Sequence, residues 1–319
     1  NGIPTKEPSV FYQLPWLGGM WRFRDAIEYN LTADWALLDL AAGRSEHFLW
    51  KAYEVARKNV ELGAKGGPFA YAIAPDQWDA SASKEFVGRL AMGGLSVKRA
   101  NSAFQVNGKS YPEGTQVLLA GQPFRSYLVD LMEPQKYPEL RSGTTGPTKR
   151  PYDVAGWTLP MMMGVKVDRI ESAVDARFED LANADQLAVP VSKDHRENSS
   201  FVFTADALAK GQKVRWSADG NILTAGDAGF DGASWELATP RVAIYEPWVT
   251  NMDAGWTQWL FDQYKVPYAA IHNADFQNGD LRARFDTIVL PSQSTASILH
   301  GIRDGERREG RFGGSGEES

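Results

Sequence analysis

The segment Pro151-Tyr-Asp-Val-Ala-Gly-Trp-Thr-Leu-Pro160, continuing through Met161-Met-Met-Gly-Val165, divides the sequence into two parts. A residue that precedes a proline is steered away from the helical region, so this segment is predicted to be extended or turn-like. One interpretation is a rigid joint, in which Trp157 and Met161–Met163 fill a core between two halves. The other is a ligand-facing loop that exposes Asp153 and Trp157. The residues leave both interpretations open.

The part before this segment predicts helices followed by an α/β pattern. Residues 1–65 form an aromatic cover and two helices, at about 22–42 and 45–62, because apolar residues recur every three or four positions. The side chains expected to face inward are Phe23, Ile27, Leu31, Trp35 and Leu38 on the first helix and Phe48, Ala52 and Val55 on the second.

Residues 66–150 form a first α/β unit in this interpretation. Its strands are expected at 69–74, 95–99 and 115–120, with a helix at 80–93 and an Asn107-Gly108 hairpin turn. The order strand, helix, strand predicts a parallel pair of strands joined by a crossover.

The part after the segment predicts an irregular, β-rich region and a second α/β unit. Residues 151–240 hold the joint and short strands at 165–170, 201–203 and 213–216. Residues 241–310 predict a truncated unit, with strands at 241–245, 268–271 and 285–290 and a helix at 253–264. Four side chains of that helix are expected to be buried, namely Trp256, Trp259, Leu260 and Phe261.

The predicted fold class is therefore α/β, with two doubly wound units, a helical N-terminal segment and a β-rich middle. Residues 311–319 have the composition of a flexible tail. Both ends of the sequence look like cuts, so a fragment is expected.

Composition excludes several classes of function. The chain has 319 residues, 43% of them hydrophobic, which is enough for about two folded domains. Its net charge of −6 and the lack of a basic run argue against nucleic acid as a partner. No apolar run reaches the roughly 20 residues that cross a bilayer, so no membrane insertion is expected. No signal peptide opens the chain. There is no cysteine, which excludes disulfides and thiolate chemistry.

One repeated pattern places an acid and a tryptophan at a strand end. Asp76 and Trp78 follow the first predicted strand, and Glu246 and Trp248 follow the strand at 241–245. Ligands of open α/β sheets bind outside the carboxyl ends of strands, where two carboxylates can act as general acid and base and indoles can stack on sugar rings. The alternative is that neighbouring acids, Asp79 and Asp253, simply cap the helices that follow.

No metal site and no cofactor is predicted. The sequence lacks the His-Glu-x-x-His pattern of zinc hydrolases, the Walker loop and the dinucleotide glycine fingerprint. His272 and Asp275 have the spacing of a ligand pair, but no convincing third ligand accompanies them.

Longer motifs resemble the downstream part of secreted bacterial proteins of the zinc carboxypeptidase family. These motifs are Trp16-Leu-Gly-Gly-Met-Trp-Arg-Phe-Arg-Asp25, Leu119-Ala-Gly-Gln-Pro-Phe-Arg125, Leu131-Met-Glu-Pro-Gln-Lys-Tyr-Pro138 and Arg150-Pro-Tyr-Asp-Val-Ala-Gly-Trp-Thr-Leu-Pro160. Three more, Arg241-Val-Ala-Ile-Tyr-Glu-Pro-Trp248, Met252-Asp-Ala-Gly-Trp256 and Leu281-Arg-Ala-Arg-Phe-Asp-Thr-Ile-Val-Leu-Pro291, resemble the degenerate glutamine-amidotransferase-like domain that ends those proteins.

The resemblance implies an accessory region without catalytic residues. The family's zinc ligands and its general base have no counterpart here, and the amidotransferase nucleophile is a cysteine, which this chain lacks. The implied protein is secreted or periplasmic, with a flavodoxin-like or amidotransferase-like fold, and its implied partner is the missing peptidase domain.

Two functions of different classes therefore remain. The first is a non-catalytic binding region, with a carbohydrate or peptide ligand near Trp78, Asp153, Trp157 and Trp248. The alternative is a free-standing hydrolase, most plausibly a glycosidase, with Asp76 and Glu246 as its catalytic pair.

Overall fold

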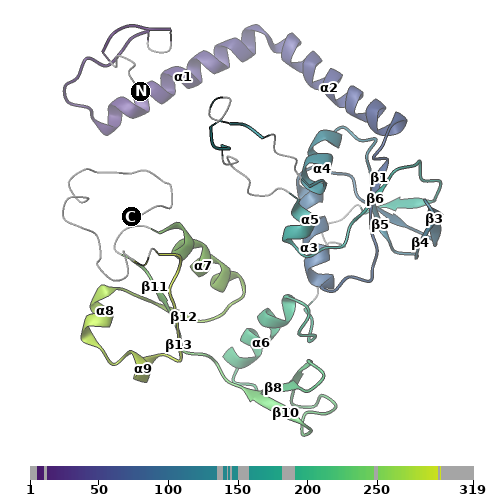
Figure 1. Ribbon diagram of the computed structural model, residues 1–319, viewed down its shortest axis with the longest axis vertical. Coiled ribbons are helices and arrows are strands. Elements are labelled where there is room, and N and C mark those ends of the chain that lie inside the picture. The colour runs from purple at the N-terminus through teal and green to yellow at the C-terminus, as the bar shows by residue number, and fades with distance from the viewer. Residues whose placement is uncertain are drawn as a thin grey trace.

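The computed structural model describes residues 6–10, 13–134, 139–141, 143, 146–149, 158–181, 191–247, 251–293 and 295. Four bodies follow one another along the chain: a helical arm, a five-stranded antiparallel sheet with covering helices, a small antiparallel sheet, and a three-stranded parallel sheet (Figure 1). The general prediction of a mixed α/β protein is confirmed. None of the described helices is both long enough and apolar enough to cross a membrane.

The arm consists of α1, Phe23–Gly43, and α2, Ser45–Lys65, joined at Arg44. Both predicted helices are confirmed. The expectation that their apolar stripes face inward is wrong, because side chains such as Phe23, Trp35, Phe48 and Val55 are exposed. Only the C-terminal end of α2 reaches the rest of the molecule, and no other described element covers the stripes (Figure 1).

The five-stranded sheet has the order β6-β1-β5-β2-β7. Its strands are β1 Ala70–Ile73, β2 Lys98–Ala100, β5 Gln116–Leu119, β6 Asp168–Ile170 and β7 Phe178–Asp180, and a hairpin of β3 Phe104–Val106 and β4 Lys109–Tyr111 joins β2 to β5. Each neighbouring pair is antiparallel.

The expected parallel pairing of the first two strands is therefore wrong, and this sheet is not a doubly wound parallel one. The hairpin turns at Asn107 and Gly108, whose φ angles of 52° and 74° are those of the predicted Asn-Gly turn. The chain then returns beside β2 as β5, so that β5 separates β1 from β2.

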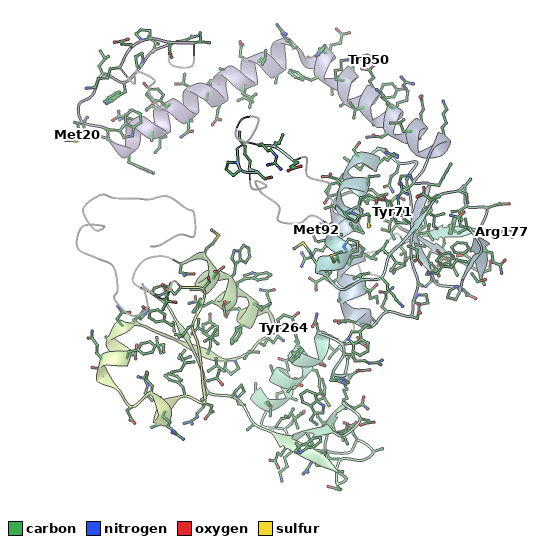
Figure 2. The ribbon with its side chains drawn as sticks, viewed as in Figure 1. Met20, Trp50, Tyr71, Met92, Arg177 and Tyr264 are labelled. Atoms are coloured by element: carbon green, nitrogen blue, oxygen red, sulfur yellow. The ribbon has the colours of Figure 1, made fainter. Side chains whose placement is uncertain are left out.

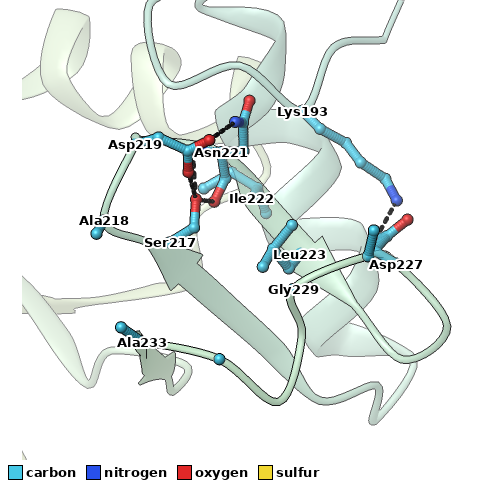
Figure 3. A pocket seen from close by; sticks show the side chains of 12 residues that line it. Lys193, Ser217, Ala218, Asp219, Asn221, Ile222, Leu223, Asp227, Gly229 and Ala233 are labelled. Carbon is cyan, nitrogen blue, oxygen red and sulfur yellow. Dashed lines mark hydrogen bonds and ion pairs between the residues drawn. The ribbon is translucent and has the colours of Figure 1, made fainter.

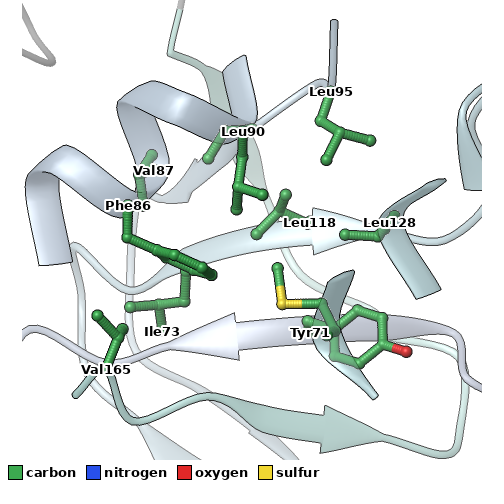
Figure 4. Close-up of a cluster of buried hydrophobic side chains, with 11 residues drawn as sticks. Tyr71, Ile73, Phe86, Val87, Leu90, Leu95, Leu118, Leu128 and Val165 are labelled. Carbon is green, nitrogen blue, oxygen red and sulfur yellow. The ribbon is translucent and has the colours of Figure 1, made fainter. Parts of the chain in front are cut away.

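Three helices cover one face of this sheet: α3 Ala80–Met92, α4 Arg125–Met132 and α5 Leu159–Met162. The core beneath them contains Tyr71, Ile73, Phe86, Leu90 and Leu128, all fully buried (Figure 4). Alternate residues of β1 point to the opposite face, where Ala70 and Ala72 are small enough for the hairpin to pack closely.

The middle of the chain folds into α6 Ser199–Ala209 and the strands β8 Val214–Ser217, β9 Ile222–Thr224 and β10 Ser234–Leu237. The sheet order is β10-β8-β9, with Ala207, Val214 and Ile222 in its core. A β-rich middle is present, but the strand expected at Phe201-Val-Phe203 is wrong, since these residues lie in α6. Three apolar residues do not distinguish strand from helix, and the helix-forming Ala205, Ala207, Leu208 and Ala209 that follow extend this segment as a helix.

The parallel sheet has the order β12-β11-β13, formed by β11 Val242–Tyr245, β12 Tyr268–Ile271 and β13 Thr287–Val289. Its helices are α7 Met252–Gln263, α8 Asn273–Asn278 and α9 Leu281–Arg284, and α7 lies on the opposite side of the sheet from α8 and α9 (Figure 1). The expected burial on α7 is wrong for Trp256, Trp259 and Leu260, which are exposed because no described element covers this outer face.

Candidate functional site

The loop after β1 presents Asp76 and Trp78 to solvent. Asp76 is exposed, and the Trp78 side chain is 69% exposed. The guanidinium of Arg196 lies 5.5 Å from the Trp78 ring centroid, a cation–π arrangement. One face of the indole is therefore already in contact with a residue of the chain.

The acid that follows, Asp79, has a structural role. Its Oδ1 accepts hydrogen bonds from the backbone N of Ala82 at 2.8 Å and from the hydroxyl of Ser81 at 2.6 Å, so it caps α3. Its Oδ2 accepts from the backbone N of Asn198 at 3.0 Å, just before α6. The capping interpretation is confirmed for Asp79, which also links the five-stranded body to the small sheet.

The cap of α7 is a different residue from the one expected. The Oδ1 of Asn251 accepts from the backbone N of Ala254 at 3.0 Å, and its Nδ2 donates to the carbonyl of Ser292 at 2.8 Å. Asp253 lies in the first turn, where a negative charge favours the helix. The sequence pattern located this helix start but not the capping side chain.

Polar side chains gather at the carboxyl edge of the parallel sheet. Glu246 and His272 directly follow β11 and β12, and the Nδ1 of His272 lies 2.9 Å from the backbone carbonyl of Glu246. In the neutral imidazole this contact keeps the proton on Nδ1 and leaves Nε2 as an acceptor. The Tyr245 hydroxyl donates to Oδ1 of Asn273 at 2.6 Å at the same edge.

Asp275, the other half of the His-x-x-Asp spacing, binds its own helix start and a side chain of α9. It accepts from the backbone N of His272 and from Arg284, each at 3.0 Å, and these bonds hold the pKa of Asp275 below its usual value. Within the described residues, no three histidine or acidic side chains gather as a metal site.

The structure does not bring the two candidate catalytic acids together. Asp76 follows a strand of the antiparallel sheet and Glu246 follows a strand of the parallel sheet, and Figure 1 shows these sheets in separate bodies. The carboxylate pairs of glycosidases lie within about 10 Å of each other. The other predicted binding residues, Trp248, Asp153 and Trp157, lie outside the described residues.

A cavity of about 540 Å³ opens on the small sheet (Figure 3). Its polar wall includes Lys193, whose Nζ lies 2.5 Å from Oδ2 of Asp227. The same Oδ2 accepts from the backbone N of Thr224 at 2.7 Å and from its hydroxyl at 2.8 Å, and the three contacts lower the pKa of Asp227 to about 2. Ser217, Asp219 and Asn221 bind one another on the opposite wall.

The polar side chains of the cavity make hydrogen bonds and ion pairs with one another, so few of their donors and acceptors are left to bind a ligand. Apart from Lys193, the cavity lining lies between residues 217 and 233, in and beside the turns that join β8, β9 and β10, and only the first of these strands was predicted. The dipeptides Asp219-Gly220 and Asp231-Gly232 are turn signals in this stretch, and Gly220 has a φ of 87°.

Two of the motifs that carry the family resemblance supply side chains that stabilise the five-stranded sheet and its covering helices. Gln122 is buried and accepts from the backbone N of Ser96 at 2.8 Å while donating to the carbonyl of Leu119 at 2.7 Å. Glu133 accepts from the Tyr71 hydroxyl at 2.6 Å and from Nε of Arg169 at 2.7 Å. Burial and the adjacent Glu133 carboxylate raise the pKa of Tyr71.

Apolar side chains are exposed on the outer side of the helical layer over the antiparallel sheet. We call the set Met92, Phe124, Tyr127, Met161 and Met162 the methionine face. Phe124 and Tyr127 lie against the backbone of Gly94 and Gly93, directly after Met92, which ends α3 (Figure 2).

The core-filling role expected for the three methionines holds only for the last of them. Met163 packs against the buried core, whereas Met161 and Met162 are 75% and 63% exposed.

Comparisons with known proteins returned no match among family models, curated proteins or solved structures. The resemblance to zinc carboxypeptidases consequently stays a prediction from the quoted motifs.

Proposed function

We propose that this chain is a non-catalytic accessory region of a secreted, zinc carboxypeptidase-like protein, and that it binds a folded peptidase domain. The observation that carries the proposal is the methionine face, where five large apolar side chains are at least 42% exposed on one helical layer. Water-exposed apolar surface of this kind marks a site of association, because covering it is favourable.

The residue types on this face suit a protein partner. Methionine adapts its shape to a partner, and aromatic rings supply large contact area, so both are enriched at protein interfaces. The face is supported from below by Leu90, Leu128 and Met132, whose burial fixes α3 and α4. A rigid support lowers the entropic cost of association.

The polar groups support binding rather than catalysis. Asp76 and Glu246 lie on separate sheets, and the cavity side chains bind one another. A doubly wound, amidotransferase-like arrangement of the parallel sheet belongs to the same proposal. The order β12-β11-β13, with a helix on each side, supports it.

Binding is tested by titrating the chain into a separately purified zinc carboxypeptidase domain and following complex formation by sedimentation. We expect a one-to-one complex that Met161→Glu weakens by at least about tenfold, because a charge on the apolar face must be desolvated. Met252→Glu is the matched control: it places the same charge on an equally exposed methionine of α7 and leaves binding unchanged. Absence of a complex at about 100 μM would contradict the proposal.

Catalysis is tested with chromogenic glycosides, esters and C-terminal peptide substrates. We expect no turnover of any of them by the purified chain. Glycoside turnover that Asp76→Ala and Glu246→Ala each abolish would replace the proposal with the hydrolase alternative.

A further inference from the structure

The helical arm leaves nearly all of its surface uncovered in the described structure. No residue of α1 is buried, and on α2 only Asn59 and Gly63 are. These two attach α2 to the body: Nδ2 of Asn59 donates to the carbonyl of Pro123 at 2.9 Å, and Gly63 lies against the backbone of Ala120. The remainder of the arm projects away (Figure 1).

The free side of α1 can be identified. The ring of Trp21 lies 5.4 Å from that of Tyr29, so the preceding segment covers part of one side of the helix. The Ile27–Leu31–Trp35–Leu38 stripe lies on another side, since these residues recur every three or four positions. This stripe has no cover in the described structure, and Trp35 and Leu38 are 69% and 59% exposed.

Two pairs of large side chains lie at equal sequence distances on either side of Arg44. Each helix has 21 residues, with Arg44 between them. Trp35 and Tyr53 lie nine positions on either side of Arg44, and Leu38 and Trp50 lie six positions on either side. Within each helix the two side chains are three residues apart and share a face.

Exposed aromatic side chains of α2 occupy the positions that mirror Trp35 and Leu38 of α1. Trp50, labelled in Figure 2, is 60% exposed and Tyr53 is 56% exposed, and their ring centroids are 5.5 Å apart. A two-fold axis through Arg44 would therefore place Trp35 opposite the partner's Tyr53 and Leu38 opposite the partner's Trp50, each contact occurring twice.

Charge favours the same pairing. Helix α1 has one basic and four acidic residues, a formal charge of −3, whereas α2 has four basic and three acidic residues, a formal charge of +1. Placing α1 against α2 of a second copy brings opposite net charges together, and placing α1 against α1 would bring like charges together.

The available area is sufficient. Large aromatic side chains bury on the order of 150–250 Å² each. The four mirrored side chains from each of two copies supply on the order of 1,000 Å², which approaches a standard specific interface.

We propose that two copies of this chain associate through their arms about a two-fold axis at Arg44, with α1 of each copy packed along α2 of the other. The association does not use the methionine face, so it can fail or hold independently of the proposed function.

Sedimentation velocity on the full chain tests the association. We expect a dimer at about 10 μM, and a monomer for Trp35→Glu combined with Tyr53→Glu, because each substitution disrupts two contacts. Thr32→Glu is the matched control on the polar side of α1 and leaves the dimer intact. Circular dichroism establishes that each variant retains its helices.

A monomeric chain at about 100 μM overturns the proposal and assigns the arm to a different partner. Dimers that persist in the Trp35→Glu/Tyr53→Glu variant overturn it as well, because association would then use another surface.

Cysteine cross-linking tests the orientation, and the cysteine-free sequence makes it unambiguous. Leu31 and Arg57 are mirrored about Arg44 and are 26 positions apart, too far for a bond within one arm of this shape. Leu31→Cys with Arg57→Cys is expected to give a covalent dimer under mild oxidation. Leu31→Cys with Lys65→Cys, which are not mirrored about Arg44, is expected to give several-fold less covalent dimer. Equal yields would overturn the two-fold arrangement.

Discussion

The absence of a side chain at Gly63 allows the arm to pack against the five-stranded sheet and its helices. A Cβ built there would lie 2.2 Å from the backbone oxygen of Ala120, so a side chain forces the backbones apart. Asn59, one turn earlier, makes its hydrogen bonds only while this close approach persists, donating to the carbonyl of Pro123 and accepting from the Ser126 hydroxyl.

Gly63→Ala should therefore lower the free energy of unfolding by about 1–3 kcal/mol, as overpacking in a rigid environment does. Faster hydrogen exchange at residues 59–65 should accompany the loss. Gly43→Ala is the control: it adds the same methyl group to an open helical position and should be neutral or slightly stabilising. Equal losses in the two variants would contradict this account.

Asp227 gives the small sheet a pH dependence that can be assigned to one carboxylate. Its bonds to Lys193 and Thr224 hold its pKa at about 2, below that of an unfolded aspartate. A lowered pKa in the folded state stabilises the protein above pH 4, and this contribution disappears as pH falls through 2.

Asp227→Asn should melt at a lower temperature than the wild-type chain at pH 6, with a difference that narrows steadily from pH 4 to pH 2. Calorimetry at three pH values measures this difference. A gap that stays constant over this range would show that the carboxylate charge is not responsible.

At the scale of elements, Asp79 connects two helices that are far apart in the sequence. It caps α3 and also accepts from the backbone just before α6. Asp79→Ala should cost at least the roughly 1–2 kcal/mol of a lost cap, since the backbone of Asn198 loses its partner as well. Asp79→Asn keeps Oδ1 as an acceptor and should cost less. Urea unfolding followed by circular dichroism gives both values, and an Asn variant as unstable as the Ala variant would refute the capping role.

Elements whose information is local could be predicted from the sequence. The two arm helices follow from apolar spacing, and the Asn107-Gly108 turn from residues that tolerate positive φ. The three-residue run Phe201-Val-Phe203 was ambiguous, because its type is decided by the residues that follow.

Features that depend on distant partners could not be predicted. The two outer strands of the five-stranded sheet, β6 and β7, follow the Pro151–Pro160 segment and pair with β1 and β2, which precede it, and no local pattern reveals this pairing. Burial on α1, α2 and α7 was predicted from apolar spacing alone, yet an apolar stripe shows only that a helix needs a cover and not that this chain supplies it. Asp76 and Glu246 do follow strands, as the sequence predicted, but the distance between them depends on which sheet each strand joins.

At the scale of the molecule, Tyr264 lies where three bodies meet (Figure 2). Its ring packs edge-on against Phe201 of α6, with centroids 6.2 Å apart. Burial raises the pKa of Tyr264, and the nearby charges of Glu85 and Asp79 on the α3 side raise it further. Lys265, the next residue, pairs with Asp206 of α6 at 2.9 Å.

Tyr264→Ala should uncouple the parallel sheet from the rest of the chain. Calorimetry should then resolve one more unfolding transition for the variant than for the wild-type chain. Tyr264→Phe keeps the ring and should retain the wild-type profile. An unchanged profile in the Ala variant would mean that the bodies are coupled elsewhere.

The strand order of the five-stranded sheet also sets an order of events during synthesis. Ala70 of β1 pairs with Ile170 of β6, and Lys98 of β2 pairs with Asp180 of β7, so the two outer strands are made long after the strands they join. The arm helices need only their own neighbours in sequence, whereas this sheet must close loops of many tens of residues, which is slow. In a nascent chain that has reached residue 120, β1, β5 and β2 can pair with one another, but the outer edges of β1 and β2 stay exposed. They are covered only when β6 and β7 have been made, about fifty and about sixty residues later.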